Sequence, residues 1–388
     1  MACPHRGRPR RLELADVVRR FGPDLEASVP LTGEQRAALR AIARCRTPAL
    51  GGHVEVCAAC GHERTVFRSC RNRHCPKCQT LNTLRWIDAR AAELLPVDYV
   101  HVVFTLPDRL HPLALRRPRA LYDLLLRSAV ETLLAFARDP QHLGAEPGIV
   151  AVLHTWGQQL TLHPHVHCIV TAGGLDPTHR RWIKTPPGFL FPVRALSPVF
   201  RGKVLDRLSR AALLDDAFDL RGLRPALTEH DWVVYAKKPF AGPHTLVQYL
   251  ARYTHRVALT NDRLLGRDGD RIRLRWRDYA HGSKKRVLTI HGATLLRRFL
   301  LHVLPHGFHH VRHAGLLANR HKAHKLLACR RYFGLKPEPH PPPKRTTTPH
   351  LLRRLGIDPL RCERCGARAI TTRPLLDPAA PPRAPNPP

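Results

Sequence analysis

Two closely spaced cysteine pairs near the N-terminus constrain the fold of this chain most strongly. Cys57-x-x-Cys60 and Cys75-x-x-Cys78 are separated by fourteen residues, just below the spacing of about 15–20 residues typical of paired zinc knuckles. Four thiolates from two tight turns satisfy tetrahedral Zn²⁺, and Gly61 favours the first turn. We therefore predict that Cys57, Cys60, Cys75 and Cys78 hold a structural zinc ion, with no open position for catalysis.

Other cysteine and histidine residues near these pairs leave the ligand set open. These residues could form a second site with Cys45, or His74 could replace one cysteine of the first site. Alternatively, they could simply lie near the metal. The residues concerned are Cys70, His53, His62 and His74. The stretch 71–74 is basic and would present positive charge beside the metal, which suits a small module that contacts DNA.

A further pair, Cys362-x-x-Cys365, lies near the C-terminus and forms only half of a zinc site. It would need a partner chain or other ligands such as a nearby histidine; alternatively, it is a decayed knuckle. A disulfide framework fits poorly, because the 11 cysteines are an odd number and seven of them lie in the first 80 residues.

The run from Thr161 to Val170 contains His165-Val166-His167. Side chains at i and i+2 of a strand point to the same face, so both imidazoles would converge while the alternate apolar residues face a core. This arrangement predicts a two-histidine clamp for a divalent metal, although such a pair can also be a packed or surface pair. Pro164 cannot donate to a β-ladder, so we expect the strand to begin after it or to lie at an edge.

Tyr249 and Tyr253 lie in a helix-compatible stretch, four residues apart and therefore on one helix face. Such a pair often only packs. Beside a metal clamp, however, it suits phosphodiester cleavage by a tyrosine nucleophile, with Mg²⁺ or Mn²⁺ as the catalytic ion. Tyrosine has a pKa of about 10 and needs this help at neutral pH.

The charge of the chain favours a nucleic-acid partner. Lys and Arg number 64 against 30 Asp and Glu, which gives a formal net charge of +34; a polyanion relieves such self-repulsion. An arginine-rich composition from a GC-rich genome could supply part of the excess. We find no apolar core of a signal peptide and no run of about eighteen apolar residues, so we expect no membrane partner and a cytoplasmic location.

The 388 residues are expected to divide into three parts. We predict a helical and zinc-binding domain over 1–95, a catalytic domain over 96–335, and a proline-rich, largely disordered tail over 336–388. The predicted helices span 11–21, 32–45, 86–95, 119–138, 244–253 and 293–333. The predicted strands span 99–106, 148–160, 165–171, 232–236, 256–260, 271–277 and 286–290.

Five segments in order carry a family resemblance. They read GGHVEVCAACGHERTVFRSCRNRHCPKCQ, LLPVDYVHVVFTLP, LTLHPHVHCIVTAGG, VQYLARYTHRVALTNDRL and FLLHVLPHGFHHVRHAGLLANR. Over roughly residues 35–335 the chain resembles the insertion-sequence ninety-one family of rolling-circle transposases. That family joins an N-terminal zinc-binding domain to a catalytic domain of the His-hydrophobe-His endonuclease superfamily.

The resemblance implies an α+β fold in which an antiparallel sheet is flanked by helices and preceded by a small zinc-binding domain. It also implies that His165 and His167 bind the catalytic metal and that Tyr249 and Tyr253 are the nucleophiles. The expected partners are single-stranded DNA at the element ends and target DNA. The third metal ligand stays open; the candidates are Gln248, His255, His163 and one of Gln158 and Gln159.

Three other functions remain open from sequence alone. A plasmid relaxase or replication initiator would share the active-site chemistry but would normally carry other flanking domains. A noncatalytic nucleic-acid-binding protein would keep the zinc and the charge. A cupin-like metal oxygenase could use His-x-His, but it would need a carboxylate and another histidine and would not need a charge of +34.

Overall fold

The computed structural model describes residues 11–91, 93–185, 192–210, 219–240, 257–279, 281–336 and 348–375. A five-stranded antiparallel sheet of order β12-β4-β5-β3-β8 lies at its centre, and helices flank it, which confirms the predicted α+β class. The strands are β3 (Tyr99–Thr105), β4 (Gly148–Trp156), β5 (Leu162–Thr171), β8 (Val234–Phe240) and β12 (Val311–Gly315).

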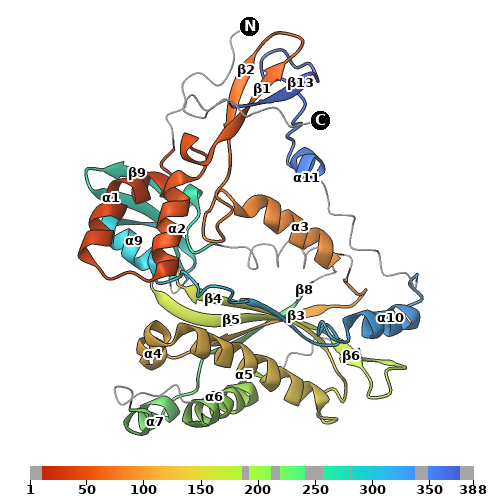
Figure 1. Cartoon of the computed structure of the whole chain (residues 1–388). Coiled ribbons are helices and arrows are strands. Elements are labelled where there is room, and N and C mark those ends of the chain that lie inside the picture. Colours follow the sequence, from red (N-terminus) through yellow and green to blue (C-terminus); the bar gives the residue numbers. More distant parts are fainter. Residues whose placement is uncertain are drawn as a thin grey trace, which may run out of the picture.

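One face of this sheet carries the main hydrophobic core. Val166, Cys168 and Val170 of β5 are buried in it, as the strand alternation predicted. Phe104 of β3 contacts Phe200 with their ring centroids 4.9 Å apart. A layer of helices lies on this side (Figure 1). It comprises η2 (Asp108–Leu110), α4 (His111–Arg116), α5 (Pro118–Arg138), α6 (Val193–Arg210) and α7 (Leu220–Thr228).

Helix α3 (Gln79–Ala91) lies on the opposite side of the sheet (Figure 1). Its Trp86 packs against Tyr99 and Ile169, which alternate with the core residues and so point to this second face. At one end of the sheet, a smaller core joins the short β6–β7 hairpin to α10. These elements are β6 (Gly173–Leu175), β7 (Trp182–Lys184) and α10 (Lys322–Tyr332).

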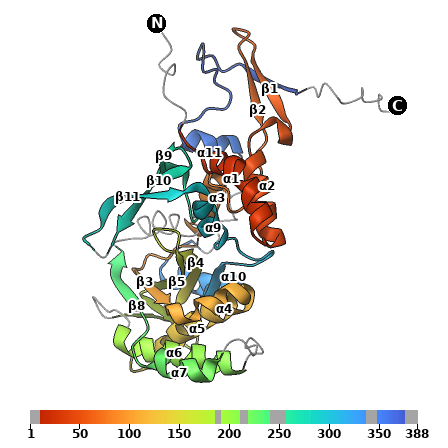
Figure 2. The ribbon, with the colours of Figure 1, turned by 90° about the vertical axis from the view of Figure 1, so that its left-hand side faces the viewer.

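A second unit joins N-terminal helices to a distant part of the chain. Helices α1 and α2 share a core with α9 and a three-stranded sheet (Figure 2). The predicted boundary at residue 95 therefore does not separate the N-terminal helices from residues 258–303, which complete their core. The elements are α1 (Leu14–Ser28), α2 (Gly33–Arg44), η3 (Asn261–Arg263), β9 (Leu264–Asp268), β10 (Arg271–Asp278), β11 (Lys284–His291) and α9 (Gly292–Leu300).

A third sheet joins two strands that follow the N-terminal helices to one strand near the C-terminus. Its order is β13-β1-β2, with antiparallel neighbours, and α11 lies between it and α3 in the view of Figure 1. Residues 348–375 were expected in a largely disordered tail; they instead form α11 and β13. The elements are η1 (Pro48–Leu50), β1 (Gly52–Cys57), β2 (Glu63–Phe67), α11 (Thr348–Arg354) and β13 (Ile370–Pro374).

Some element predictions are wrong for identifiable reasons. The helix expected over 293–333 is interrupted by a turn at Pro305–Phe308 and by edge strand β12, which pairs with β4 far away in sequence. Residues 257–260 are not a strand. The helix expected over 244–253 lies outside the described residues.

The prediction for Pro164 is also wrong, because β5 begins at Leu162 and is a central strand. The β4–β5 register shifts between His154 and Trp156, and β3 ends opposite His165. Pro164 thus lies at an irregularity where its missing N–H costs little, while its carbonyl accepts from the Leu106 N–H at 3.1 Å. In the described part of the chain, we find no helix long and apolar enough to cross a membrane.

Candidate metal centres and active site

Three histidines converge on the face of the central sheet that lies toward α3. In the β4–β5 pairing, His154 lies opposite His165, and His167 follows two residues along β5. All three side chains therefore point to the same side. One ligand nitrogen from each lies within 4.8 Å of the others. The sequence identified two members of this group and missed His154.

One hydrogen bond fixes how His165 presents its nitrogens, and a contact with His101 orients His167. His165 Nδ1 donates to the His163 carbonyl at 2.7 Å, so the neutral ring has its lone pair on Nε2. His167 Nδ1 lies 2.9 Å from Nε2 of the buried His101. When His167 Nδ1 donates in this contact, its Nε2 also carries a lone pair, and His101 then orients the ring from behind.

The nitrogen spacing fits a shared cation. His165 Nε2 and His167 Nε2 are 3.1 Å apart. Two nitrogens each about 2.1 Å from one ion lie roughly 3.0–3.4 Å apart for bond angles between a right angle and the tetrahedral value. In the tautomer that has a lone pair on both Nε2 atoms, a divalent ion between them would remove the repulsion of the two lone pairs. The residues present therefore fit a metal centre.

His154 is the third candidate ligand, and it is almost completely buried. Its ring stacks on Trp156 with a centroid distance of 4.4 Å, which restricts its orientation. A turn over residues 157–161 pairs His154 with His165 across the β4–β5 hairpin. Recognising this turn in the sequence could have identified His154. Without knowledge of this pairing, His154 was only one apolar-flanked histidine in a buried strand.

The other candidates for the third ligand make other contacts or lie outside the described residues. Gln158 Oε1 accepts from the Arg277 N–H at 3.4 Å, and the Gln159 carbonyl accepts from the Arg298 side chain. His163 contributes its carbonyl to His165, and its ring is outside the three-histidine group. Gln248 and His255 lie outside the described residues.

Four cysteines form a compact group between α2 and α3. Sγ of Cys45 lies 3.6 Å from Sγ of Cys75 and of Cys78, and Cys70 lies 3.6 Å from Cys78. Thiolates about 2.3 Å from one tetrahedral Zn²⁺ are roughly 3.8 Å apart, whereas disulfide sulfurs are about 2.05 Å apart. The spacing therefore fits zinc ligands.

The predicted grouping of the cysteines is wrong. Cys75 and Cys78 belong with Cys45 and Cys70, whereas Cys57 and Cys60 meet Cys362 and Cys365 in a separate group. The physical reason is that β1 and β2 extend the first knuckle away from residues 70–78 (Figure 1). The four residues predicted as one site are thus divided between two.

His74 is not a member of either cysteine group. Its Nε2 accepts a hydrogen bond from the Leu304 N–H at 3.4 Å, and burial lowers its pKa to about 3. His74 is therefore neutral at pH 7 and connects the cysteine-rich loop to the segment after α9. His53 and His62 lie beside Glu55 and Glu363, also outside both groups.

Comparison with known proteins agrees with these features. A family model described as "Transposase zinc-binding domain" matches residues 17–106, and one described as "Putative transposase" matches residues 148–325. The chain is 47% identical over 350 residues to "Putative transposase y4qJ" of Sinorhizobium fredii (strain NBRC 101917 / NGR234), with 87% of each chain covered.

A second relative is the "Transposase for insertion sequence element IS801" of Pseudomonas savastanoi pv. phaseolicola. It is 32% identical over 349 residues, which cover 84% of this chain and 81% of the relative. The chain belongs to the IS91 family of transposases. This confirms the resemblance drawn from the five sequence segments. No solved structure matches the chain.

The cysteine group and the histidine group of this transposase fall within different family matches. The Cys45, Cys70, Cys75 and Cys78 group falls within the zinc-binding match, and the three histidines fall within the transposase match. Tyr249 and Tyr253 also fall within residues 148–325, but they lie outside the described residues. Cys362 and Cys365 fall beyond both matches.

A cavity of about 400 Å³ lies between the cysteine-rich loop, the end of β4 and the segment after α9. Trp156, which stacks on His154, lines it together with Phe308 and His302. Arg73 also lines it and donates to the Phe308 carbonyl at 2.8 Å.

Proposed function

We propose that this transposase cleaves single-stranded DNA at the ends of its element by transesterification to tyrosine. The observation that carries the proposal is the convergence of His154, His165 and His167, with their orienting contacts, on one sheet face. When bound there, a divalent ion such as Mg²⁺ or Mn²⁺ would polarise the scissile phosphate. The net charge of +34 supports attraction of the DNA backbone.

The tyrosines would carry the covalent step. The phenol oxygen of Tyr249 or Tyr253 bonds to phosphorus, the bond to the 3′ oxygen breaks, and a 5′-phosphotyrosine and a free 3′-hydroxyl result. The phosphodiester bond energy is conserved, so the 3′-hydroxyl can prime replication or attack a second phosphotyrosine. Two phenols on one helix face would let one active site hold two cleaved ends at once.

The direct test is formation of a covalent adduct. Purified transposase is incubated with single strands that span candidate element ends, with Mg²⁺ or Mn²⁺ or with a chelator, and the products are separated under denaturing conditions. We expect a metal-dependent protein–DNA adduct together with a free 3′-hydroxyl fragment. Binding without any adduct on cognate ends would instead identify a noncatalytic nucleic-acid-binding protein.

His101 is proposed as a positioning residue for His167. Replacing His101 with alanine removes the partner of His167 Nδ1, and loss of such an orienting contact typically weakens metal affinity about 10–100-fold. We expect the Mn²⁺ concentration needed for half-maximal cleavage to rise by that factor. The variant His101→Gln, which can still accept the hydrogen bond, should recover part of the affinity; an unchanged Mn²⁺ requirement in His101→Ala would contradict this role.

The zinc proposed for Cys45, Cys70, Cys75 and Cys78 is structural. Because structural zinc supplies much of the folding free energy of a small module, Cys75→Ser should lose about one Zn²⁺ and unfold the loop between β2 and α3. Limited proteolysis and metal analysis of the purified chain measure both effects. Cys329→Ser, a change at a buried cysteine outside both groups, is the control and should keep its zinc.

A further inference from the structure

The N-terminal and C-terminal Cys-x-x-Cys segments have the same local structure. In each, the glycine after the second cysteine has a positive φ, +68° at Gly61 and +77° at Gly366. Each glycine N–H donates to the carbonyl of the first cysteine, at 2.9 Å from Cys57 and at 3.0 Å from Cys362. Both segments therefore share the backbone conformation of a zinc knuckle.

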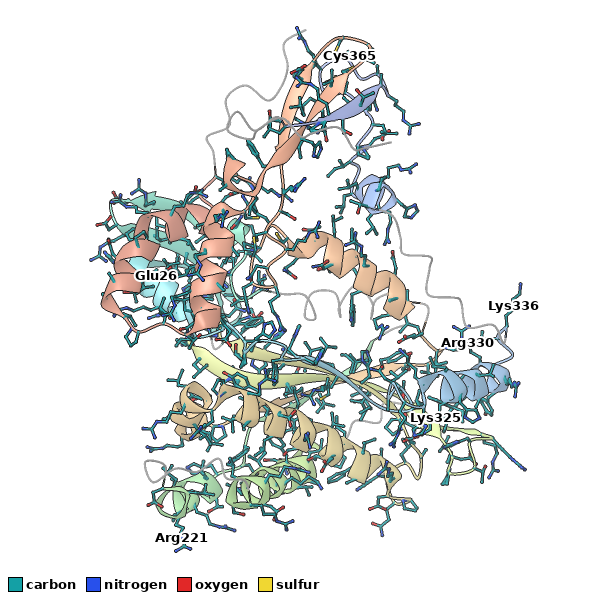
Figure 3. The ribbon with its side chains drawn as sticks, in the orientation of Figure 1. Glu26, Arg221, Lys325, Arg330, Lys336 and Cys365 are labelled. Carbon is teal, nitrogen blue, oxygen red and sulfur yellow. The ribbon has the colours of Figure 1, made fainter. Side chains whose placement is uncertain are left out.

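The knuckles face each other with sulfur spacings that fit zinc. Sγ of Cys57 lies 3.7 Å from Sγ of Cys365, and Sγ of Cys60 lies 3.7 Å from Sγ of Cys362. Tetrahedral Zn²⁺ places its thiolates roughly 3.8 Å apart. Cys365 lies at the top of the molecule in Figure 3.

The sheet that carries these knuckles has too small a core to hold itself together. In β1 only Val54 and Cys57 are buried, β2 has no buried residue, and β13 is exposed apart from the half-buried Ile370. Three strands need a hydrophobic face for independent stability. Exposed ion pairs such as Arg373–Glu63 and Arg64–Glu363 add little.

We propose that Cys57, Cys60, Cys362 and Cys365 bind a second structural zinc ion, which fastens the C-terminal segment to the N-terminal module. The site closes a loop of the chain from Cys60 to Cys362 and fixes the five-residue register of β13 on β1. It requires ligands from both segments of one chain, so neither segment alone is a zinc-binding unit.

The same segment also contacts α3, the helix on the histidine side of the central sheet. Thr348 accepts a hydrogen bond from Arg85 at 3.0 Å, and Arg354 forms an ion pair with Asp88. The zinc ion would therefore hold α11 in position along α3. This places residues beyond both family matches in contact with the element that covers the active face of the sheet.

Zinc content tests the shared site. The full chain is purified with His165 and His167 replaced by alanine, so that the histidine group takes no zinc, and bound zinc is measured after dialysis. With all cysteines present, we expect two Zn²⁺ per chain. The double variants Cys57→Ser/Cys60→Ser and Cys362→Ser/Cys365→Ser should each bind one Zn²⁺ per chain. The fourfold variant should also bind one. Two zinc ions in either double variant, or a further loss in the fourfold variant, would overturn the proposal.

A second experiment tests the site first in a chain that keeps all its cysteines, because the serine variants could lose zinc simply by misfolding. A specific protease site replaces residues 339–345, and the cut chain is analysed by size-exclusion chromatography. The two fragments should elute together in zinc and separate after chelation, and the cut Cys362→Ser/Cys365→Ser chain should separate without a chelator. Fragments that separate even in the presence of zinc would show that zinc does not join them. Fragments that separate only on reduction would show that a disulfide joins them.

Discussion

Alanine in place of His154, His165 or His167 is expected to reduce metal-dependent cleavage of single-stranded DNA by at least about 100-fold. Each change removes one of three nitrogens that converge within 4.8 Å. Nonspecific DNA binding should change little, because it depends on the summed phosphate contacts of a chain with net charge +34. Adduct formation and a salt-dependent binding assay measure the two properties separately.

His163→Ala is the matched control for the histidine group. Its backbone carbonyl, which accepts from His165 Nδ1, is retained, and its ring is outside the group. We expect near-normal cleavage from this variant at the same metal concentration. Each variant is checked by thermal unfolding, because His154 is buried and its replacement leaves a cavity beside Trp156. Normal cleavage by the three alanine variants would refute the assignment of the metal centre.

The double variant Tyr249→Phe/Tyr253→Phe is expected to form no covalent adduct. Phenylalanine keeps the ring and removes only the hydroxyl, so a complete loss would assign the chemistry to the phenol oxygens. Residues four apart on a helix are offset by roughly 6 Å along its axis, so only one phenol can be in line with a given phosphate. Each single variant should therefore retain partial cleavage of oligonucleotides and should lose transposition in cells.

The single tyrosine variants distinguish alternating nucleophiles from a packed pair. If one phenol only packs, its phenylalanine variant should transpose normally. Normal transposition by either single variant would reduce the protein to a single-tyrosine enzyme. The measurements are adduct yield on defined single strands and the transposition frequency of a marked element in cells.

Local sequence patterns were sufficient to predict those structural features that depend only on residues close together in the chain. Alternation along β5 placed His165 and His167 on one face and Val166, Cys168 and Val170 in the core, because the period of a strand is two residues. The capping-box pattern of Thr32 and Gln35 is also local, and in α2 the Gln35 N–H donates to Thr32 Oγ1 at 3.3 Å. The five ordered segments were also sufficient to identify the transposase family.

Only the tertiary structure decided which distant residues meet. His154 joins the histidine pair through the β4–β5 register, and residues 258–303 complete the core of α1 and α2. Spacing along the chain placed Cys57 and Cys60 with Cys75 and Cys78, whereas strand pairing places them with Cys362 and Cys365. A zinc knuckle supplies two ligands wherever it occurs, so its sequence specifies a half-site. The other half is chosen by the backbone pairing of β1 with β13, which no local pattern encodes.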